Sequence, residues 1–315
     1  MRYFNFKIYK PKFWDTNSYS VAAIFLMPLS LILKVLFMLR KKLVNKISFK
    51  IPIICVGNLY LGGTGKTPLV IEVAKILKKL KKKPAIIKKN YADQFDEIDL
   101  IKKSNKNIFT GPCRQVAITK AISKGLNIAV LDDGFQDYSI NKDLNILCFN
   151  SKQLVGNGLT IPSGPLREPL KVVGSCNIVI INGNKNAKFE NKIKKFSKNI
   201  SFYYTKYVPQ KISKFKNKKI LAFAGIGNPD NFFSLMEKHN LNIEKKISFP
   251  DHYIYSRKDI QNLISISKEK KMRLVTTEKD YFRLKKIGYS NIDYISVKLK
   301  ILNKLKFIKE IKKYI

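Results

Sequence analysis

The sequence predicts an α/β protein with parallel β-sheets, organised as two α/β units that follow an apolar N-terminal helix. From residue 51 onward, short apolar runs that do not alternate with polar residues are separated by helical stretches, which is typical of buried parallel strands. The Lys-rich stretch 206–219 is a candidate linker between the units. The chain has 315 residues, of which 45% are hydrophobic, so one large or two ordinary domains can bury a core.

The N-terminal apolar run spans 21–39, with basic residues on both sides. It approaches the roughly 20 residues needed to cross a bilayer. Lys34 within the run and the two basic flanks favour a helix embedded in one leaflet. A single membrane span and a buried core helix remain the alternatives. We expect this helix region, residues 1–45, to be associated with a membrane.

The remaining elements follow in order along the chain. The predicted strands are 51–56, 85–87, 127–131, 144–149, 178–181, 220–224, 274–276 and 292–297. The predicted helices are 66–80, 113–124, 229–239, 257–269 and 302–313. The four cysteines show no metal-ligand spacing and lie in or beside apolar stretches, so we expect buried thiols.

The chain is strongly basic, with 61 Lys and Arg against 22 Asp and Glu, a formal net charge of +39. Such a charge favours anionic partners: a phospholipid surface, nucleic acid or a phosphorylated substrate. Lysines are diffuse along the chain, however, and no nucleic-acid-binding motif is present, so we expect no specific nucleic-acid partner. Lys, Asn and Ile are abundant along the whole chain, which favours a general compositional drift as the main source of the charge. Seven of the basic residues are Arg, and each is more informative because this drift toward Lys has not removed it.

A phosphate-binding loop follows the first predicted strand, in the sequence VGNLYLGGTGKTP. Glycines allow backbone N–H groups to surround phosphate oxygens, and the helix N-terminus adds partial positive charge. Lys66 can reach the β- and γ-phosphates of a nucleotide, and the Thr67 hydroxyl can bind Mg²⁺. One departure is Tyr60, which stands where the usual loop begins with Gly. The expected nucleotide-binding residues are Gly62, Gly63, Thr64, Gly65, Lys66 and Thr67.

Asp132 and Asp133 end the predicted strand 127–131, in the sequence LNIAVLDDG. Ligands bind at the carboxyl ends of strands in sheets of this type. The sequence therefore predicts that these two carboxylates hold Mg²⁺ together with Thr67. A polar turn is the alternative interpretation.

Taken in order, the motifs resemble the tetraacyldisaccharide 4′-kinases of lipid A biosynthesis. The resemblance rests on VGNLYLGGTGKTP (56–68), DDGFQ (132–136), GNGLTIPSGPLREP (156–169), AGIGNPDNFF (224–233), FPDH (249–252) and TTEKD (276–280). It implies two α/β/α sandwich domains, the first similar to P-loop NTPases, and transfer of the ATP γ-phosphate to the 4′-hydroxyl of an acylated glucosamine disaccharide 1-phosphate. It also implies ATP and Mg²⁺ as cofactors, with the enzyme on the cytoplasmic face of the bacterial inner membrane.

The resemblance assigns roles to individual residues. Asp96 takes the place of the family's base, His252 that of its partner, and Lys66 binds phosphate. The expected substrate-binding residues are Tyr91, Arg114, Gln136 and Arg167. For Arg114 and Arg167 an ion pair within the domain is the alternative. Thr276, Thr277 and Asp280 of the TTEKD motif could line the cleft, and a helix N-cap is the alternative interpretation.

Two departures from the family pattern bear on this site. Where the family has Ser-Arg-Gly-Tyr-Gly, the chain has Lys-Lys-Asn-Tyr-Ala at 88–92, and the following loop is short, so Asp93 and Asp99 remain alternatives to Asp96 as the base. Asp137 replaces a family His, which exchanges a possible cation for an anion near the metal. We still expect an active enzyme.

The expected organisation is a helix region 1–45, a P-loop catalytic domain 46–208 and a second domain 209–315 that closes an active-site cleft. A membrane-associated P-loop ATPase that switches partners is the competing function. Such proteins often carry an additional Lys ahead of the paired glycines, and this chain has Leu61 there.

Overall fold

The computed structural model describes residues 10–16, 19–90, 95–251 and 253–315. Their contacts divide the chain into two compact units. The larger unit comprises 10–90, 104–206 and 299–315, and the smaller unit comprises 207–298 together with a segment that ends at 103. The expected boundary at 208/209 therefore differs from this division, because 299–315 belongs with the larger unit and the segment before 104 with the smaller one.

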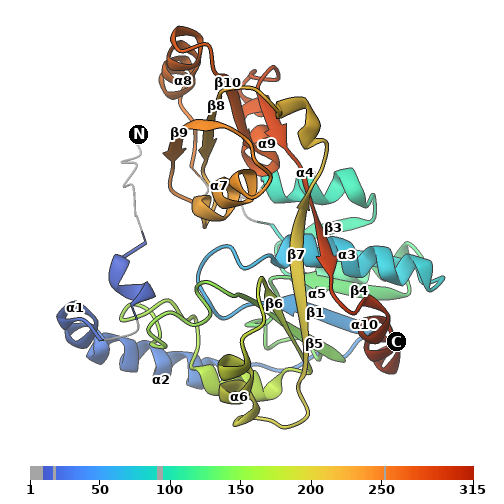
Figure 1. The fold of residues 1–315 in the computed structure, drawn as a ribbon. Helices are drawn as coiled ribbons and strands as arrows, with labels where there is room; N and C mark the ends of the chain where they lie inside the picture. The colour runs from blue at the N-terminus through green and yellow to red at the C-terminus, as the bar shows by residue number, and fades with distance from the viewer. Residues whose placement is uncertain (1–9, 17–18, 91–94, 252) are drawn as a thin grey trace, which may run out of the picture. The chain divides into compact units, whose positions relative to one another are not determined.

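The larger unit is built on an eight-stranded sheet in the order β12-β7-β6-β5-β1-β4-β2-β3 (Figure 1). The neighbours from β7 to β3 pair in parallel. The strands are β1 (Ile53–Gly57), β2 (Pro84–Lys89), β3 (Ile108–Gly111), β4 (Ile128–Asp132), β5 (Leu144–Asn150), β6 (Ile178–Asn182), β7 (Ser201–Pro209) and β12 (Val297–Ile301). The predicted parallel α/β architecture is confirmed.

Helices cover both faces of this sheet. Strand residues such as Ile53, Ile87 and Leu131 form one core with α5 (Arg114–Ser123) and α6 (Ala187–Lys194). The helix α3 (Lys66–Lys79) packs against β1, β2 and β4, and buries apolar residues along its length. The helix α10 (Lys304–Ile311) joins it through an ion pair between Lys304 and Glu72. The layers are therefore α/β/α.

The smaller unit has a four-stranded parallel sheet in the order β11-β10-β8-β9. One face packs on α7 (Pro229–Glu237), and the other on α8 (Arg257–Glu269) and α9 (Glu278–Lys286). This unit is also an α/β/α sandwich, and α4 (Phe95–Ser104) belongs with it. The strands are β8 (Ile220–Ala224), β9 (Ile243–Ser248), β10 (Arg273–Thr277) and β11 (Asp293–Ile295).

The apolar N-terminal run forms two helices, α1 (Val21–Phe25) and α2 (Met27–Leu43). The first turn of α2 contains Pro28, which lacks the N–H that a continuing helix would need. Ser30 anchors α2 to the larger unit by a 2.8 Å hydrogen bond to the Ser163 hydroxyl. Within the described residues, no helix is long and apolar enough to cross a membrane.

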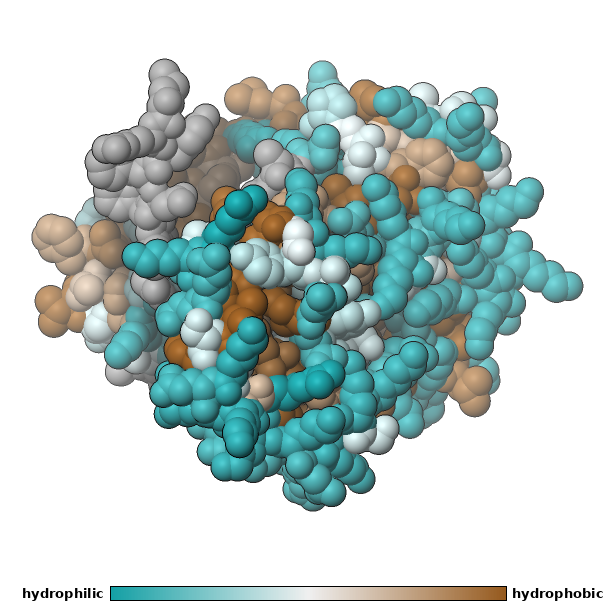
Figure 2. Space-filling view, turned by 90° about the horizontal axis from the view of Figure 1, so that it is seen from above, coloured by the Kyte–Doolittle hydropathy of each residue, from teal (hydrophilic) through white to brown (hydrophobic). Residues whose placement is uncertain are grey.

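Most apolar side chains of α1 and α2 are exposed, which argues against the buried core helix considered above. The exposed fraction reaches 85% for Val21 and 84% for Phe25, whereas Ala23 and Ser30 are buried. Elsewhere, hydrophilic side chains cover most of the face seen in Figure 2, as the diffuse distribution of lysine predicts.

Candidate active site

The phosphate loop lies where the sequence places it, between β1 and the first residue of α3. Gly65 precedes the helix with φ of 93°, and Gly62 has φ of 133°, a region that side chains with a Cβ rarely occupy. Thr64 is buried, and its hydroxyl has no hydrogen-bond partner among the described residues. A buried hydroxyl without a partner is costly, and a phosphate oxygen would supply one.

Tyr60, the departure from the usual loop, has a structural role. It is 1% exposed, and its hydroxyl donates to the Asp15 carboxylate. Lys10 donates to the same hydroxyl over 2.8 Å. Burial and the neighbouring carboxylate raise the pKa of Tyr60 above its ordinary value. The side chain thus fixes the approach to the glycines instead of leaving it flexible.

The segment that contains Arg167 is attached to this approach by backbone hydrogen bonds. Leu61 N–H donates to the Pro165 carbonyl, and Arg167 N–H donates to the Leu59 carbonyl, both over 2.8 Å. The attachment brings the Arg167 guanidinium to Asp133, with Nη1 3.1 and 3.0 Å from the two carboxylate oxygens. Arg167 is therefore part of the nucleotide-loop region, and it forms the ion pair that the sequence left as an alternative.

The two aspartates are held by three cations. Asp132 Oδ2 lies 2.9 Å from Lys88 Nζ and 3.3 Å from the Thr67 hydroxyl. Asp133 lies 3.7 Å from Lys66 Nζ, in addition to its pair with Arg167. Burial raises the pKa of Asp133, but Lys66 and Arg167 outweigh it, so the pKa lies below its ordinary value.

The residues present fit a magnesium ion that is bound together with a nucleotide. Asp132 is 1% exposed, and its Oδ1 atom has no hydrogen-bond partner among the described residues. The Thr67 hydroxyl lies beside the same carboxylate. Mg²⁺ commonly takes one or two protein oxygens, with phosphate and water completing its shell. The described residues contain no cluster of three or more His, Cys, Asp or Glu suited to a metal.

Arg114 organises the turn after β4. Its guanidinium donates to the carbonyl oxygens of Asp132, over 3.3 Å, and Asp133, over 2.7 Å. It also pairs with Asp137 over 3.1 Å. Burial raises the pKa of Asp137, whereas hydrogen bonds from Ser139 and the Arg114 charge lower it below its ordinary value. The anion that replaces the family histidine is thus balanced by a cation.

Gln136 and Asn58 connect the DDGFQ segment with the phosphate loop. Asn58 is not among the candidate site residues that the sequence predicts. Gln136 Nε2 donates to the Asn58 carbonyl over 3.0 Å, and Asn58 Nδ2 donates to the carbonyls of Tyr60 and Gly62. The position of Asn58 beside the glycines was the available signal. The buried Oδ1 of Asn58 and Oε1 of Gln136 have no partner in the described part of the chain.

A cavity of about 300 Å³ adjoins this site, and its lining is mainly apolar. One wall comes from α2, and the others come from the phosphate-loop approach, the DDGFQ segment and the Arg167 segment. The lining residues are Phe37, Arg40, Leu61, Gln136, Tyr138, Ile161, Arg167 and Glu168.

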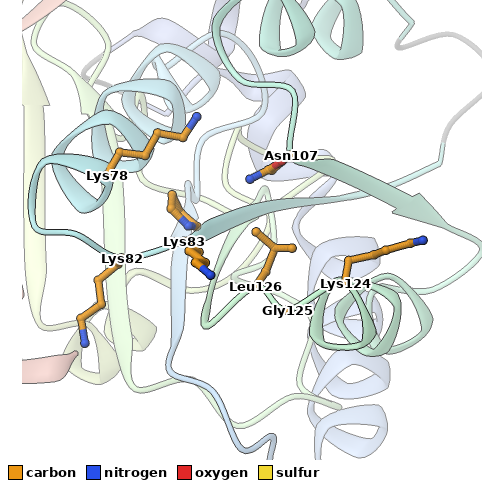
Figure 3. Close-up of a pocket in the computed structure, with 8 residues that line it drawn as sticks. Lys78, Lys82, Lys83, Asn107, Lys124, Gly125 and Leu126 are labelled. Carbon is orange, nitrogen blue, oxygen red and sulfur yellow. The ribbon is translucent and has the colours of Figure 1, made fainter.

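A second cavity of about 340 Å³ lies at the opposite end of the sheet, where β2 begins. Figure 3 shows its lysines, Lys78, Lys82, Lys83 and Lys124, with amino groups that point in different directions. Because these cations do not converge on one point, the cavity has no evident chemical role.

In the smaller unit, Asp96 is fully buried on α4. Its Oδ2 atom lies 2.6 Å from Arg283 Nη2 and 3.8 Å from Lys279 Nζ, while Oδ1 has no hydrogen-bond partner among the described residues. The adjacent Glu97 pairs with Lys279 over 2.8 Å. Asp99 is half-buried on the same helix. Tyr91, Asp93 and His252 lie outside the described residues.

The TTEKD residues begin α9. The Thr277 hydroxyl accepts from the Asp280 N–H over 3.1 Å, so Thr277 is the N-cap that the sequence left as an alternative. Asp280 is fully buried; it accepts from the Gly225 N–H over 3.0 Å and from the Tyr255 hydroxyl over 3.0 Å. Arg283 pairs with Asp280 over 3.0 Å as well as with Asp96. The motif thus forms a buried charge network.

Comparison with known proteins identifies the family. The family model of Tetraacyldisaccharide-1-P 4′-kinase, LpxK, matches residues 22–315. The chain is 41% identical to the tetraacyldisaccharide 4′-kinase of Pelagibacter ubique (strain HTCC1062) and 34% identical to that of Rickettsia canadensis (strain McKiel). Each alignment covers 94% of this chain and 94% of the relative.

A solved structure is similar over nearly the whole chain. It is the "apo" form of LpxK from Aquifex aeolicus in complex with ATP, with a TM-score of 0.71 and 25% identity. The match covers 93% of this chain and 99% of that chain. From the fold, the phosphate loop and these relatives together, the chain belongs to the tetraacyldisaccharide 4′-kinase family.

Proposed function

We propose that this protein transfers the γ-phosphate of ATP to the 4′-hydroxyl of a tetraacyldisaccharide 1-phosphate. The observation that carries the proposal is the phosphate loop beside Asp132, where buried oxygens that have no partner in the described part of the chain lie close to several cationic side chains. The relatives named above carry the same activity in their names. The competing ATPase switch has no comparable support.

The nucleotide-binding part of the proposal uses Gly62, Gly63, Thr64, Gly65, Lys66 and Thr67. Their N–H groups and the α3 N-terminus would bind the phosphates, with Lys66 on the β- and γ-phosphates. Thr67, Asp132 and Asp133 would hold Mg²⁺, which neutralises charge that develops on the phosphoryl group. Since Asp133 is paired with Lys66 and Arg167, we expect these cations to move toward phosphate when nucleotide binds.

The acceptor part uses the apolar cavity beside α2. Arg40 and Arg167 can attract a phosphate, and Phe37 and Leu61 can pack against an acyl chain or a sugar face. The side-chain oxygen of Gln136 has no hydrogen-bond partner among the described residues and can accept from a sugar hydroxyl. Arg114 contributes by organising the Asp132–Asp133 turn.

We further propose that Asp96 accepts the proton of the 4′-hydroxyl and that His252 assists it. Supporting this, Asp96 Oδ1 is buried and lacks a partner among the described residues, although Oδ2 is bound to Arg283. A positioned carboxylate typically contributes 10²–10⁴-fold to such proton transfers, as an order of magnitude.

Membrane association would follow from α1 and α2. Their exposed apolar side chains and the basic last turn of α2, Arg40 to Lys42, suit the surface of an anionic leaflet. We expect binding to vesicles that contain phosphatidylglycerol, and an Ile32→Asp/Leu39→Asp variant should lose most of it. Equal sedimentation of both proteins with the vesicles would contradict the proposal.

The deciding experiment measures transfer of label from γ-labelled ATP to tetraacyldisaccharide 1-phosphate in detergent. We expect transfer by the wild type. In Lys66→Ala the rate of transfer should fall by at least about 10³-fold, because the transition state loses the cation that stabilises its phosphoryl charge. Lys79→Ala, at the exposed far end of the same helix, is the matched control and should retain activity. If ATP were hydrolysed at the same rate with and without the lipid, and no label were transferred, the ATPase switch would be established instead.

A further inference from the structure

Lys88 is a buried cation at the centre of the nucleotide site, in a position where the family motif has serine. It is 2% exposed and lies 2.9 Å from Asp132 Oδ2. The register explains the contact: Ile87 of β2 pairs with Leu131 of β4, so the next residues on the two strands, Lys88 and Asp132, lie side by side. The contact is therefore built into the sheet.

The charge balance of the site disfavours a divalent metal that binds without nucleotide. Two carboxylates, Asp132 and Asp133, face three cations, Lys66, Lys88 and Arg167. A divalent cation that arrives alone meets this excess of positive charge and is repelled by it. An anionic nucleotide is attracted, and it meets Lys66 and Lys88 from two different elements of the fold.

We propose that Lys88 is a second phosphate-binding lysine, which lets nucleotide bind tightly before the metal and weakens metal binding in the absence of nucleotide. The inference rests on the proposed function. Lysine suits the role because its ammonium is a compact charge on a flexible stem, able to exchange Asp132 Oδ2 for a phosphate oxygen. Asp132 Oδ1, which lacks a partner among the described residues, remains available for the metal shell.

A purely structural role makes a different prediction. If Lys88 only neutralised Asp132, Lys88→Met/Asp132→Asn would bind ATP without metal as tightly as Asp132→Asn alone, because the carboxylate that needs a counter-charge is absent from both variants. Binding measurements with each ligand alone therefore distinguish the two roles.

The experiment measures ATP binding in EDTA by calorimetry and Mn²⁺ binding without nucleotide by electron paramagnetic resonance. For Lys88→Met and Lys88→Ser we expect ATP binding in EDTA to weaken by about tenfold or more, and Mn²⁺ binding to tighten severalfold, because one buried charge is lost. Lys88→Arg should retain most ATP binding. Lys83→Met removes the same charge from the exposed residue just before β2 and should change neither affinity.

Unchanged affinities for both ligands in folded Lys88→Met would overturn the inference and leave the kinase proposal intact. A wild type that binds no ATP even with Mg²⁺ would overturn both. Should Lys88→Met fail to fold, Lys88→Met/Asp132→Asn removes both partners of the pair. This double variant should bind ATP in EDTA about tenfold more weakly than Asp132→Asn alone, and equal binding would reject the role.

Discussion

Asp132 in the larger unit and Asp96 in the smaller unit are in similar states but differ in what holds them. Each carboxylate is buried. In each, Oδ2 forms an ion pair with a cationic side chain, and Oδ1 has no hydrogen-bond partner among the described residues. Asp132 is held by a lysine, whose single amino group can move. Asp96 is held by Arg283, whose planar guanidinium is fixed in turn by Asp280 and by the Gly225 carbonyl.

The difference lies in whether the cations around each carboxylate can be exchanged for a ligand. Around Asp132 and the adjacent Asp133 the cations come from β2, α3 and the Arg167 segment, so a ligand can redistribute them. At Asp96 both cations come from α9, which is itself capped by the Thr277–Asp280 pair. We infer an exchangeable site in the first case and a permanently positioned carboxylate in the second.

The largest expected effect is on kcat, and it tests whether Asp96 is the base. Asp96→Asn should lower kcat for phosphoryl transfer by about 10²–10⁴-fold, because the amide cannot accept the proton of the attacking hydroxyl. The KM for ATP should change little. Steady-state transfer kinetics with the labelled assay give both values.

Glu97→Gln, which changes the neighbouring carboxylate on the same helix, is the control for altered packing and should have the smaller effect. Full activity in Asp96→Asn would move the base to Asp99 or Asp93, and the same substitution at those positions would then locate it.

The next effect is on the free energy of unfolding, and it tests how strongly Arg283 stabilises the buried carboxylates. Arg283→Met leaves Asp96 and Asp280 buried without their shared cation, so the free energy of unfolding should fall by about 3–5 kcal/mol. Arg273→Met, in the same unit, removes an arginine whose side chain is 53% exposed and should cost about 0–1 kcal/mol. Denaturant unfolding measures both, and similar losses would show that burial of the network contributes little.

The smallest effect concerns the pH dependence of the larger unit. The pKa of Asp137 lies below its ordinary value when folded, because Ser139 and Arg114 outweigh burial. Its contribution to stability is therefore complete above the unfolded pKa of about 3.9 and is lost as the pH falls through the folded value. Asp137→Asn should flatten the decline in melting temperature below about pH 4 relative to wild type; an unchanged acid profile would argue against the pairing.

The elements that sequence reasoning identified are those with continuous apolar runs, such as β1, β4 and β8. The sequence does not predict β3, β7 and β9, because their residues are largely half-buried or exposed. The predicted single strand 292–297 is wrong, because β11 and the start of β12 lie there, in different sheets. The sequence also does not predict α4, α6 or α9, whose residues are largely polar. Of these, α4 and α9 share the buried charge network around Arg283. Local pattern cannot show a charge that is neutralised by a residue far away in the chain.

The candidate site also contains parts that the sequence predicts and contacts that it cannot predict. The phosphate loop is predictable because its strand, loop and helix are adjacent in sequence, and Asp132 is predictable because it follows an apolar strand, where ligands bind in sheets of this type. The pair between Lys88 and Asp132 was not, since it depends on the order of β2 and β4 in the sheet. The contacts of Arg114 and Arg167 were open alternatives that only the three-dimensional arrangement could decide.

The network around Asp96 also has a consequence for biosynthesis. Asp96 and Arg283 are 187 positions apart. At about 5–20 residues per second, translation reaches Arg283 roughly 10–40 s after Asp96. Throughout that interval α4 lacks the cations that neutralise its carboxylates, so the helix is expected to complete its packing late, when most of the chain has already left the ribosome.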